Sequence, residues 1–263
     1  MYDYAALRSS AIDKVNRIFS TFELTEDFDD LGRTIIELCL NFQIIAVAAL
    51  LEDADSIKFN RNLCRICSNW VKYLKYCVGR NLIPKKPSYI VPIFSYILSG
   101  NKEFAIEMVG LAKKLPKSDF EYEDEFQFKQ LVSFLSEFAM FENLDCKSKI
   151  LECKNSLDKI GNDRATFQSQ LAGAIIEKNE DDFIAIFRNY SEYHEFENEN
   201  QSKNLATPFT IYSPNRYIWF EGLSWLKLAE ISQFFVGQQF LYCPFLARKS
   251  IDYTYDNDWI LEF

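Results

Sequence analysis

Cys64 and Cys67 form the pattern in this chain that comes nearest to a metal or redox site. A structural zinc site needs four ligands at suitable spacing, but the next cysteine is Cys77 and the single histidine, His194, lies far along the chain. A redox CxxC usually opens a helix beside a βαβ unit, whereas this pair lies inside a predicted helix. We therefore interpret these cysteines as half-buried core thiols and predict neither a metal nor a cofactor.

His194 is the second candidate for chemistry, because histidine is the general base of many nucleophilic triads. A triad also needs a nucleophile and an orienting acid, and the surrounding sequence SEYHEFENE has no turn of the GxSxG type. The chain has no glycine-rich phosphate loop either. We expect His194 to be exposed to solvent, and we predict no catalytic residue. An enzyme with an unfamiliar motif is the least favoured hypothesis.

Charge is distributed unevenly along the chain, whose formal net charge is −9. All charged side chains in residues 58–102 are basic, so the remainder is more acidic than the total indicates. Fields of this kind influence association more than fold. Two acidic clusters are therefore candidate contact surfaces: Glu121, Glu123, Asp124 and Glu125 form the first, and Glu192, Glu195, Glu197 and Glu199 form the second.

The basic stretch over residues 58–86 raises the question of nucleic-acid binding. Nucleic-acid readers usually combine a net basic domain with groove-reading or stacking elements, but this protein is acidic overall. We therefore predict no direct contact with nucleic acid. The face formed by Arg61, Arg65, Lys72 and Lys75 is interpreted as solvated or as paired with acids of the same chain.

The composition favours a helical fold. Hydrophobic residues make up 48% of the 263 residues and aromatic residues 16%, enough for a sizeable core. Only 8 Gly and 7 Pro interrupt the chain, which favours long helices over many short strands. We predict an all-α protein, a multi-helix bundle of stacked helical hairpins with a buried C-terminal helix. It forms a single domain over residues 1–263, with sub-halves 1–116 and 117–263.

Apolar periodicity and turn signals place the individual helices. Two predicted hairpins have similar polar turns that contain Asn101 and Asn179. We expect an irregular segment over 198–216, and a tail that ends in a short strand or docks by Trp259, Ile260 and Phe263. Helices are predicted over residues 3–19, 57–78, 88–98, 102–115, 118–141, 147–160, 163–177, 181–197 and 217–235, with a further long helix that ends near residue 53.

No stretch of the sequence has the roughly 20 uninterrupted apolar residues of a membrane span. Residues 35–51 come nearest, but Glu37, Asn41 and Gln43 interrupt them. The first residues lack the basic start and apolar block of a signal peptide. Seven cysteines, an odd number, are most simply explained as reduced thiols in a cytosol. We predict a cytoplasmic protein.

Residues 217–248 are the stretch around which the rest of the chain is organised. Residues 217–235 are apolar around most of the predicted helix, which is typical of a central helix. Gly237 is expected to end that helix, because glycine is favoured just past a helix C-terminus. Pro244 then requires an extended or turn geometry at Cys243. The predicted module is a buried helix, a short return and a proline-fixed segment.

This stretch also resembles a known family. The runs FEGL and LKLAE, followed by YCP and LAR, resemble the C-terminal signature of the immunity protein 49 family, all-helical proteins that neutralise a cognate bacterial polymorphic toxin. Immunity proteins of another nuclease toxin class also end in an aromatic helix and a Tyr-Pro segment, and they are the alternative. The signature residues of this chain are Glu221, Gly222, Leu223, Tyr242, Cys243, Pro244 and Arg248.

The resemblance implies a non-enzymatic antitoxin that binds a toxin domain and blocks its active site or substrate access. Toxins that act on nucleic acid are commonly basic, so the two acidic clusters are the predicted toxin-binding surfaces. A helical-repeat scaffold or adaptor without a toxin partner is the alternative function. Glu221 and Arg248 could form a catalytic pair, but we favour a structural role in which they fix the return segment onto the central helix, because buried charges must be paired.

Overall fold

The computed structural model describes residues 3–22, 28–82, 91–112, 114, 131, 147–203, 216–237, 239–249 and 254–262. Within these residues all regular secondary structure is helical, and no strand is present. The predicted all-α class is therefore confirmed, and the helices pack as pairs in sequence order. The first acidic cluster, the predicted helix over 118–141 apart from Leu131, and Phe263 lie outside the described residues.

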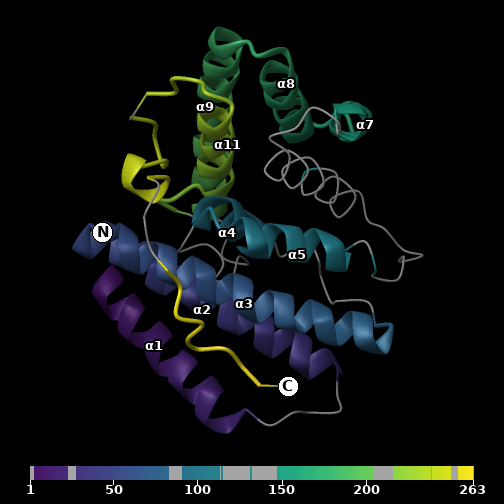
Figure 1. The fold of residues 1–263 in the computed structure, drawn as a ribbon. Coiled ribbons are helices and arrows are strands. Elements are labelled where there is room, and N and C mark those ends of the chain that lie inside the picture. The colour runs from purple at the N-terminus through teal and green to yellow at the C-terminus, as the bar shows by residue number, and fades with distance from the viewer. Residues whose placement is uncertain are drawn as a thin grey trace.

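The first three helices form the lower layer of the molecule in Figure 1. The Asp3 carboxylate accepts a hydrogen bond from the Ala6 amide (2.9 Å), and Asp55 accepts one from the Lys58 amide (2.8 Å). Aspartate at these positions satisfies amides that have no partner inside the helix. The helices are α1 (Tyr4–Thr21), α2 (Phe28–Asp53) and α3 (Ser56–Arg80), with α2 packed between the other two.

The α2 helix is the most apolar element of this layer. By length and composition alone, Asp30–Asp53 could cross a membrane, but 72% of its most apolar window is buried inside the fold. Leu31, Ile35 and Leu38 are completely buried, and the amides Asn41 and Gln43 are buried as well. These features are those of a core helix in contact with α1, α3 and α4.

Two helical hairpins follow, and both have the predicted turn chemistry. The Asn101 side chain accepts a hydrogen bond from the Phe104 amide, and the Asn179 side chain accepts one from the Asp182 amide. Each asparagine therefore caps the second helix of its hairpin. The first hairpin is α4 (Val91–Ser99) and α5 (Lys102–Ala112), and the second is α8 (Asp163–Glu177) and α9 (Glu180–Lys203), with α7 (Lys147–Asp158) packed on α8.

The predicted irregular segment over 198–216 is wrong in its first part, because α9 continues to Lys203. Asn198 is buried in this last part of α9, and its side-chain amide donates to the Arg216 carbonyl (2.9 Å). That contact gives a buried polar side chain inside the helix a hydrogen-bond partner. Residues 204–215 lie outside the described part of the chain.

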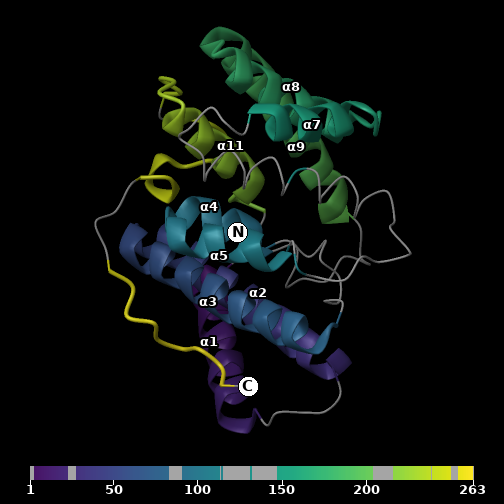
Figure 2. The same cartoon turned by 45° about the vertical axis from the view of Figure 1, so that its right-hand side comes forward.

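The last long helix, α11 (Phe220–Ile231), lies against α4 and beside α9 (Figure 2). A short 3-10 helix, η2 (Phe245–Ala247), follows it and contacts α3. The C-terminal residues 254–262 then run without regular secondary structure over the lower layer, next to α3. The α11 helix therefore joins the upper helices to the lower ones.

Candidate functional site

The α11 helix is buried along most of its length, from Phe220 to Ala229. It begins three residues later than predicted, because Trp219 is in an extended conformation and its amide donates to the Tyr242 carbonyl (2.8 Å). The Trp219 ring folds back over Gly222, where an added Cβ would lie 2.1 Å from the ring atom Cε3. Gly222 is therefore the residue that allows the ring to cover the helix start.

The helix also ends earlier than the sequence suggested, at Ile231. Gln233 occupies the left-handed region (φ 69°), and the Phe234 amide donates to the Ala229 carbonyl (2.9 Å). A left-handed residue after a helix commonly closes it in this way. Gly237, predicted to end the helix, instead turns the segment that follows (φ 67°). We call residues 232–237 and 239–244 the return segment.

The signature residue Glu221 is the centre of a buried polar cluster. Its side chain is only 4% exposed and contacts Arg164 (2.5 Å), Gln168 (2.7 Å) and the Tyr190 hydroxyl (2.7 Å). Burial alone would raise the pKa of the Glu221 carboxyl, but the Arg164 charge and the hydrogen bonds from Gln168 and Tyr190 lower it below its usual value. Glu221 thus joins α11 to α8 and α9. The expectation that it fixes the return segment is wrong.

Arg248 forms a second cluster on the other side of α11. Its guanidinium is buried and contacts the Glu230 carboxylate and the Gly237 carbonyl, while Lys227 donates to the Arg248 carbonyl (2.9 Å). Burial raises the pKa of Glu230, an effect that the nearby Arg248 and Lys227 charges oppose. Arg248 therefore links α11 to the return segment. Glu221 and Arg248 therefore have separate partners among the described residues.

The remaining signature residues lie around these clusters. Leu223 is completely buried in the core, and so is Cys243, whose thiol lies 3.8 Å from the Trp219 carbonyl oxygen. Tyr242 has a left-handed backbone (φ 60°), and Pro244 follows in an extended conformation before η2. These residues shape the path of the chain beside α11.

His194 is not exposed as predicted. Its ring stacks on Trp219, with centroids 4.4 Å apart and an interplanar angle of 9°. Burial lowers the pKa of His194 to about 4, and its Nε2 atom has no hydrogen-bond partner among the described residues. The chain sequence hides this contact, because Trp219 lies far from His194 along the chain.

The cysteine pair lies in the core, as predicted, but is fully buried on α3 and not half-buried. Burial raises the pKa of Cys64 to about 12 and that of Cys67 well above its usual value. Such thiols are protonated and weakly reactive at neutral pH. Among the described residues, no group of three or more His, Cys, Asp or Glu side chains could hold a metal ion.

An open cavity of about 480 Å³ lies between α9 and the return segment. We call it the α9 groove. Phe235 projects beside it and is 82% exposed, and Leu241 is 52% exposed. The Phe235 amide is fixed by a hydrogen bond to the Glu180 carboxylate (2.9 Å). The groove is lined by Ile184, Arg188, Ser191, Glu192, Glu195, Phe235, Val236, Gly237, Gln239, Phe240 and Leu241.

Two acids of the second acidic cluster lie on this same face of the molecule, whereas Glu197 lies on the side of α9 next to Tyr193. Glu192 and Glu195 line the α9 groove, and Glu197 follows them on α9. None of these three carboxylates has an ion-pair partner in the part of the chain that the structure describes. Glu199 is exposed on the same helix. The structure thus places four of the eight predicted contact acids on one helix, beside exposed apolar side chains.

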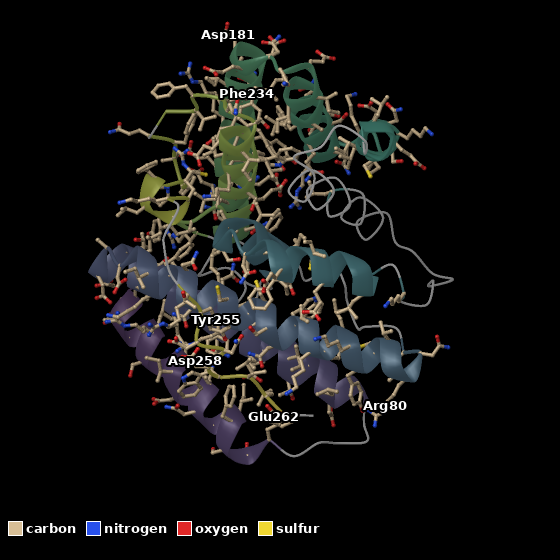
Figure 3. The ribbon with its side chains drawn as sticks, viewed as in Figure 1. Arg80, Asp181, Phe234, Tyr255, Asp258 and Glu262 are labelled. Atoms are coloured by element: carbon tan, nitrogen blue, oxygen red, sulfur yellow. The ribbon has the colours of Figure 1, made fainter. Side chains whose placement is uncertain are left out.

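Sequence reasoning missed the apolar part of this site. The apolar periodicity placed Phe235 inside the central helix, whereas the helix ends before it and exposes its ring. Phe234, the buried neighbour of Phe235, lies close to α11 in Figure 3. Asp181, also labelled there, marks the start of α9. A signal for the exposed ring was the Phe-Phe pair directly after a polar Ser-Gln turn, since only one of two adjacent rings can face the core.

The basic face of α3 has a different environment, because its charges have partners within the chain. Arg65 pairs with Asp258, Lys72 with Glu262 (2.8 Å) and Lys75 with Glu107 (2.6 Å). The hydrogen bonds from Arg65 lower the pKa of Asp258, and the nearby Arg61 charge lowers it further. The interpretation that this face pairs with acids of the same chain is confirmed for these residues.

Comparison of the chain with family models, with curated proteins and with solved structures finds no match. The function must therefore be inferred from the groups that the fold brings together. Those groups are a buried polar framework around α11 and an acidic, partly apolar groove along α9.

Proposed function

We propose that this protein is a non-enzymatic immunity protein, a cytoplasmic antitoxin that binds a cognate bacterial toxin domain. The toxin would be a basic domain, of the kind that acts on nucleic acid, and binding would block its active site or the access of its substrate. The observation that carries the proposal is the α9 groove, where unpaired acids lie beside an exposed aromatic ring.

The composition of the groove supports a protein partner. Binding energy in protein interfaces is concentrated in a few aromatic or arginine anchors surrounded by polar contacts. Phe235 and Leu241 provide exposed apolar surface, and Glu192 and Glu195 provide charge within the same cavity. Arg188 is also exposed in the lining and could meet an acidic group of the partner. A basic protein surface with one apolar protrusion would complement this arrangement.

The surroundings of the signature residues support a binding role over a catalytic one. Glu221 is occupied by three neighbours, and Arg248 by the Glu230 carboxylate and a backbone carbonyl. Groups that are engaged in this way hold helices in place. These contacts are consistent with the resemblance to the immunity protein 49 family, whose members are all-helical proteins that neutralise a cognate toxin.

We also propose the finer description of the fold, a single domain built from stacked helical hairpins. The turns of α4–α5 and α8–α9 share an asparagine cap, which favours two versions of one local motif. The same observation favours the second candidate function, a helical-repeat scaffold without a toxin partner. The two functions differ in what they bind, so a binding experiment separates them.

The test is co-expression with the protein encoded directly upstream of this chain in its genome. An antitoxin should rescue the growth of cells that express the upstream protein, and the two should co-purify as a complex. Phe235→Ala should weaken co-purification without lowering the melting temperature, because the Phe235 ring is exposed. Phe187→Ala, which removes a buried ring, is the matched control that should lower the melting temperature. Absence of both rescue and co-purification would contradict the antitoxin proposal and favour the scaffold.

A further inference from the structure

The C-terminal residues 254–262 form a peptide that lies across the helices of the lower layer without adding secondary structure of its own. Tyr255, Asp258 and Glu262 mark its course in Figure 3, from the α5 side of the molecule toward its lower edge. Most of its described side chains are at least partly accessible to solvent, and Leu261 is the exception at 2% exposure. We call this segment the tail.

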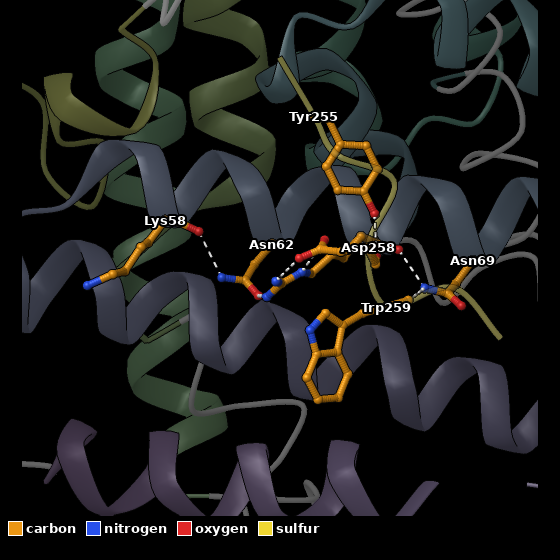
Figure 4. Close-up of polar contacts among 7 residues, drawn as sticks. Lys58, Asn62, Asn69, Tyr255, Asp258 and Trp259 are labelled. Carbon is orange, nitrogen blue, oxygen red and sulfur yellow. Dashed lines mark hydrogen bonds and ion pairs between the residues drawn. The ribbon is translucent and has the colours of Figure 1, made fainter. Parts of the chain in front are cut away.

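Arg65 of α3 recognises the acidic residue of the tail. Its Nε and Nη2 atoms donate to the two different carboxylate oxygens of Asp258, the first at 2.9 Å. A third nitrogen, Nη1, donates to the Asn62 side chain (3.0 Å), which holds the guanidinium in position (Figure 4). A two-point contact between arginine and a carboxylate is specific in geometry as well as in charge. The donor side of this contact is therefore organised by α3 itself.

Asn69, one turn further along α3, recognises the backbone of the tail. Its side-chain amide donates to the Trp259 carbonyl (2.9 Å), and its side-chain oxygen accepts from the Leu261 amide (3.0 Å). These two contacts hold the backbone on both sides of Ile260, directly after the bend at Trp259 (φ 56°). The same amide donates to the Arg65 carbonyl (2.8 Å), so Asn69 is fixed on its own helix.

Apolar contacts complete the recognition. The Trp259 ring meets the Phe19 ring of α1 edge-on at 5.1 Å, and the Arg65 guanidinium lies 5.8 Å from the Trp259 ring centroid. Leu261 is buried in the core. The helices thus offer an arginine for an acid, an aromatic edge for an aromatic ring, and a buried position for an aliphatic side chain.

We propose that this face of α3, with Phe19 of α1, is a recognition site for a peptide segment in which an acid, an aromatic residue and, two positions later, an aliphatic residue follow one another, with a bend of the backbone at the aromatic residue (φ 56° at Trp259). The tail is its occupant within the chain, and a partner segment of the same chemistry binds when it replaces the tail. Hydrogen bonds within α3 hold the Arg65 and Asn69 side chains in position, so the site keeps its geometry when the tail leaves it. The proposal does not depend on the antitoxin function.

Tethering explains why the site is filled in the free protein. A segment joined to its own site has an effective concentration on the order of millimolar, so a free peptide at micromolar concentration competes poorly with an intact tail. Weakening the tail while leaving the helices unchanged should therefore open the site to a peptide in trans. Asp258 and Trp259 are the tail residues to change, because both contact Arg65.

The experiment uses the full chain carrying Asp258→Ala and Trp259→Ala, and a fluorescent peptide with the unchanged sequence of residues 254–263. Fluorescence anisotropy should show saturable binding at least about tenfold tighter than to the unmodified chain. Adding Asn69→Ala should abolish that binding, because it removes both backbone contacts. Adding Lys75→Ala instead should leave it unchanged, since Lys75 pairs with Glu107 and not with the tail.

A second measurement uses the unmodified protein and needs no substitution. Unlabelled peptide at millimolar concentration should speed hydrogen exchange of the Leu261 amide, which donates to Asn69 only while the tail is bound. A folded tail variant that binds no peptide, or that binds it equally well with Asn69→Ala, would overturn the proposal. Leu261 exchange that does not respond to peptide would overturn it as well.

Discussion

Glu221 on α11 and Glu192 on α9 are glutamates of neighbouring helices with opposite surroundings. Glu221 is buried and has an arginine, an amide and a hydroxyl as partners. Glu192 is exposed, lines the α9 groove and has no ion pair within the described part of the chain. A paired buried charge organises the fold, whereas an unpaired exposed charge is available to another molecule. The α11 framework should therefore control stability, and the α9 face should control binding.

The largest effect on stability is expected from Gly222→Ala in the α11 framework. The added methyl group would overlap the Trp219 ring, which is enclosed by Phe187, Tyr190 and His194. The substitution should cost about 3 kcal/mol of unfolding free energy in urea, at the upper end for an overpacked core. Gly79→Ala is the control, because nothing lies within 4 Å of its added Cβ, and it should raise stability by about 0.5 kcal/mol. Equal effects of the two changes would contradict the packing at Gly222.

The next effect is that of Glu221→Ala, which removes the acceptor shared by Gln168 and Tyr190. Stranding these buried donors should cost about 2–3 kcal/mol. Loss of the ion pair with Arg164 adds less to this cost, because the Arg164 side chain is half-exposed and water can solvate its charge. Glu221→Gln keeps the shape and part of the hydrogen bonding, so it should cost less than Glu221→Ala. If Glu221→Ala left the unfolding free energy in urea unchanged, that result would contradict a stabilising role for Glu221.

A smaller effect is expected from pH through His194. Its pKa is lowered to about 4 in the folded protein, against about 6.5 in an unfolded chain. The unfolded state therefore binds the proton first, and the contribution of neutral His194 to stability is lost as pH falls from 6.5 toward 4. We expect a loss on the order of 1–2 kcal/mol at pH 5.5. His194→Gln should flatten this part of the stability–pH curve, whereas an unchanged curve would contradict the burial of His194.

The smallest effect on stability is expected on the α9 face. Glu192→Lys, Glu195→Lys and Glu197→Lys together should change the unfolding free energy by no more than about 0.5 kcal/mol, because Glu192 is exposed, Glu195 and Glu197 are partly exposed, and none of the three has an ion pair among the described residues. Thermal and urea unfolding measure this directly. A large loss of stability would show that these acids belong to the framework, and the contrast between α9 and α11 would fail.

Much of the fold could be predicted from the sequence, because helical periodicity and polar turns are local signals. The hairpin turns at Asn101 and Asn179 were found in this way. The ends of α11 were not, because they depend on two residues that propensity does not identify. Trp219 is held extended by the distant Tyr242, and Gln233 takes the left-handed conformation that the sequence assigned to Gly237.

The candidate site could be predicted only in part. The acids of α9 were recognisable as a charge cluster, but the groove requires a return segment whose path is set by Arg248 and Gly237. His194 was misplaced because its stacking partner Trp219 comes from another helix end. The partners of the α3 cations could not be predicted either, because Asp258 and Glu262 lie near the other end of the chain. Whether a charge cluster is free to bind a partner depends on contacts between residues that lie far apart in the sequence.

The most direct test of the α9 face is the rate at which the protein associates with the toxin domain that co-purifies with it. We would compare two triple variants of equal net charge by stopped flow over a range of salt. One carries Glu192→Lys, Glu195→Lys and Glu197→Lys. The control reverses exposed acids elsewhere that also have no ion pair among the described residues, with Asp13→Lys, Glu52→Lys and Glu177→Lys.

The α9 variant should associate about tenfold more slowly than the control at low salt, with a difference that shrinks as salt screens the field. The matched charge ensures that this difference reports the position of the acids and not the total charge. Equal association rates for the two variants at every salt concentration would contradict the claim that the α9 face receives the partner.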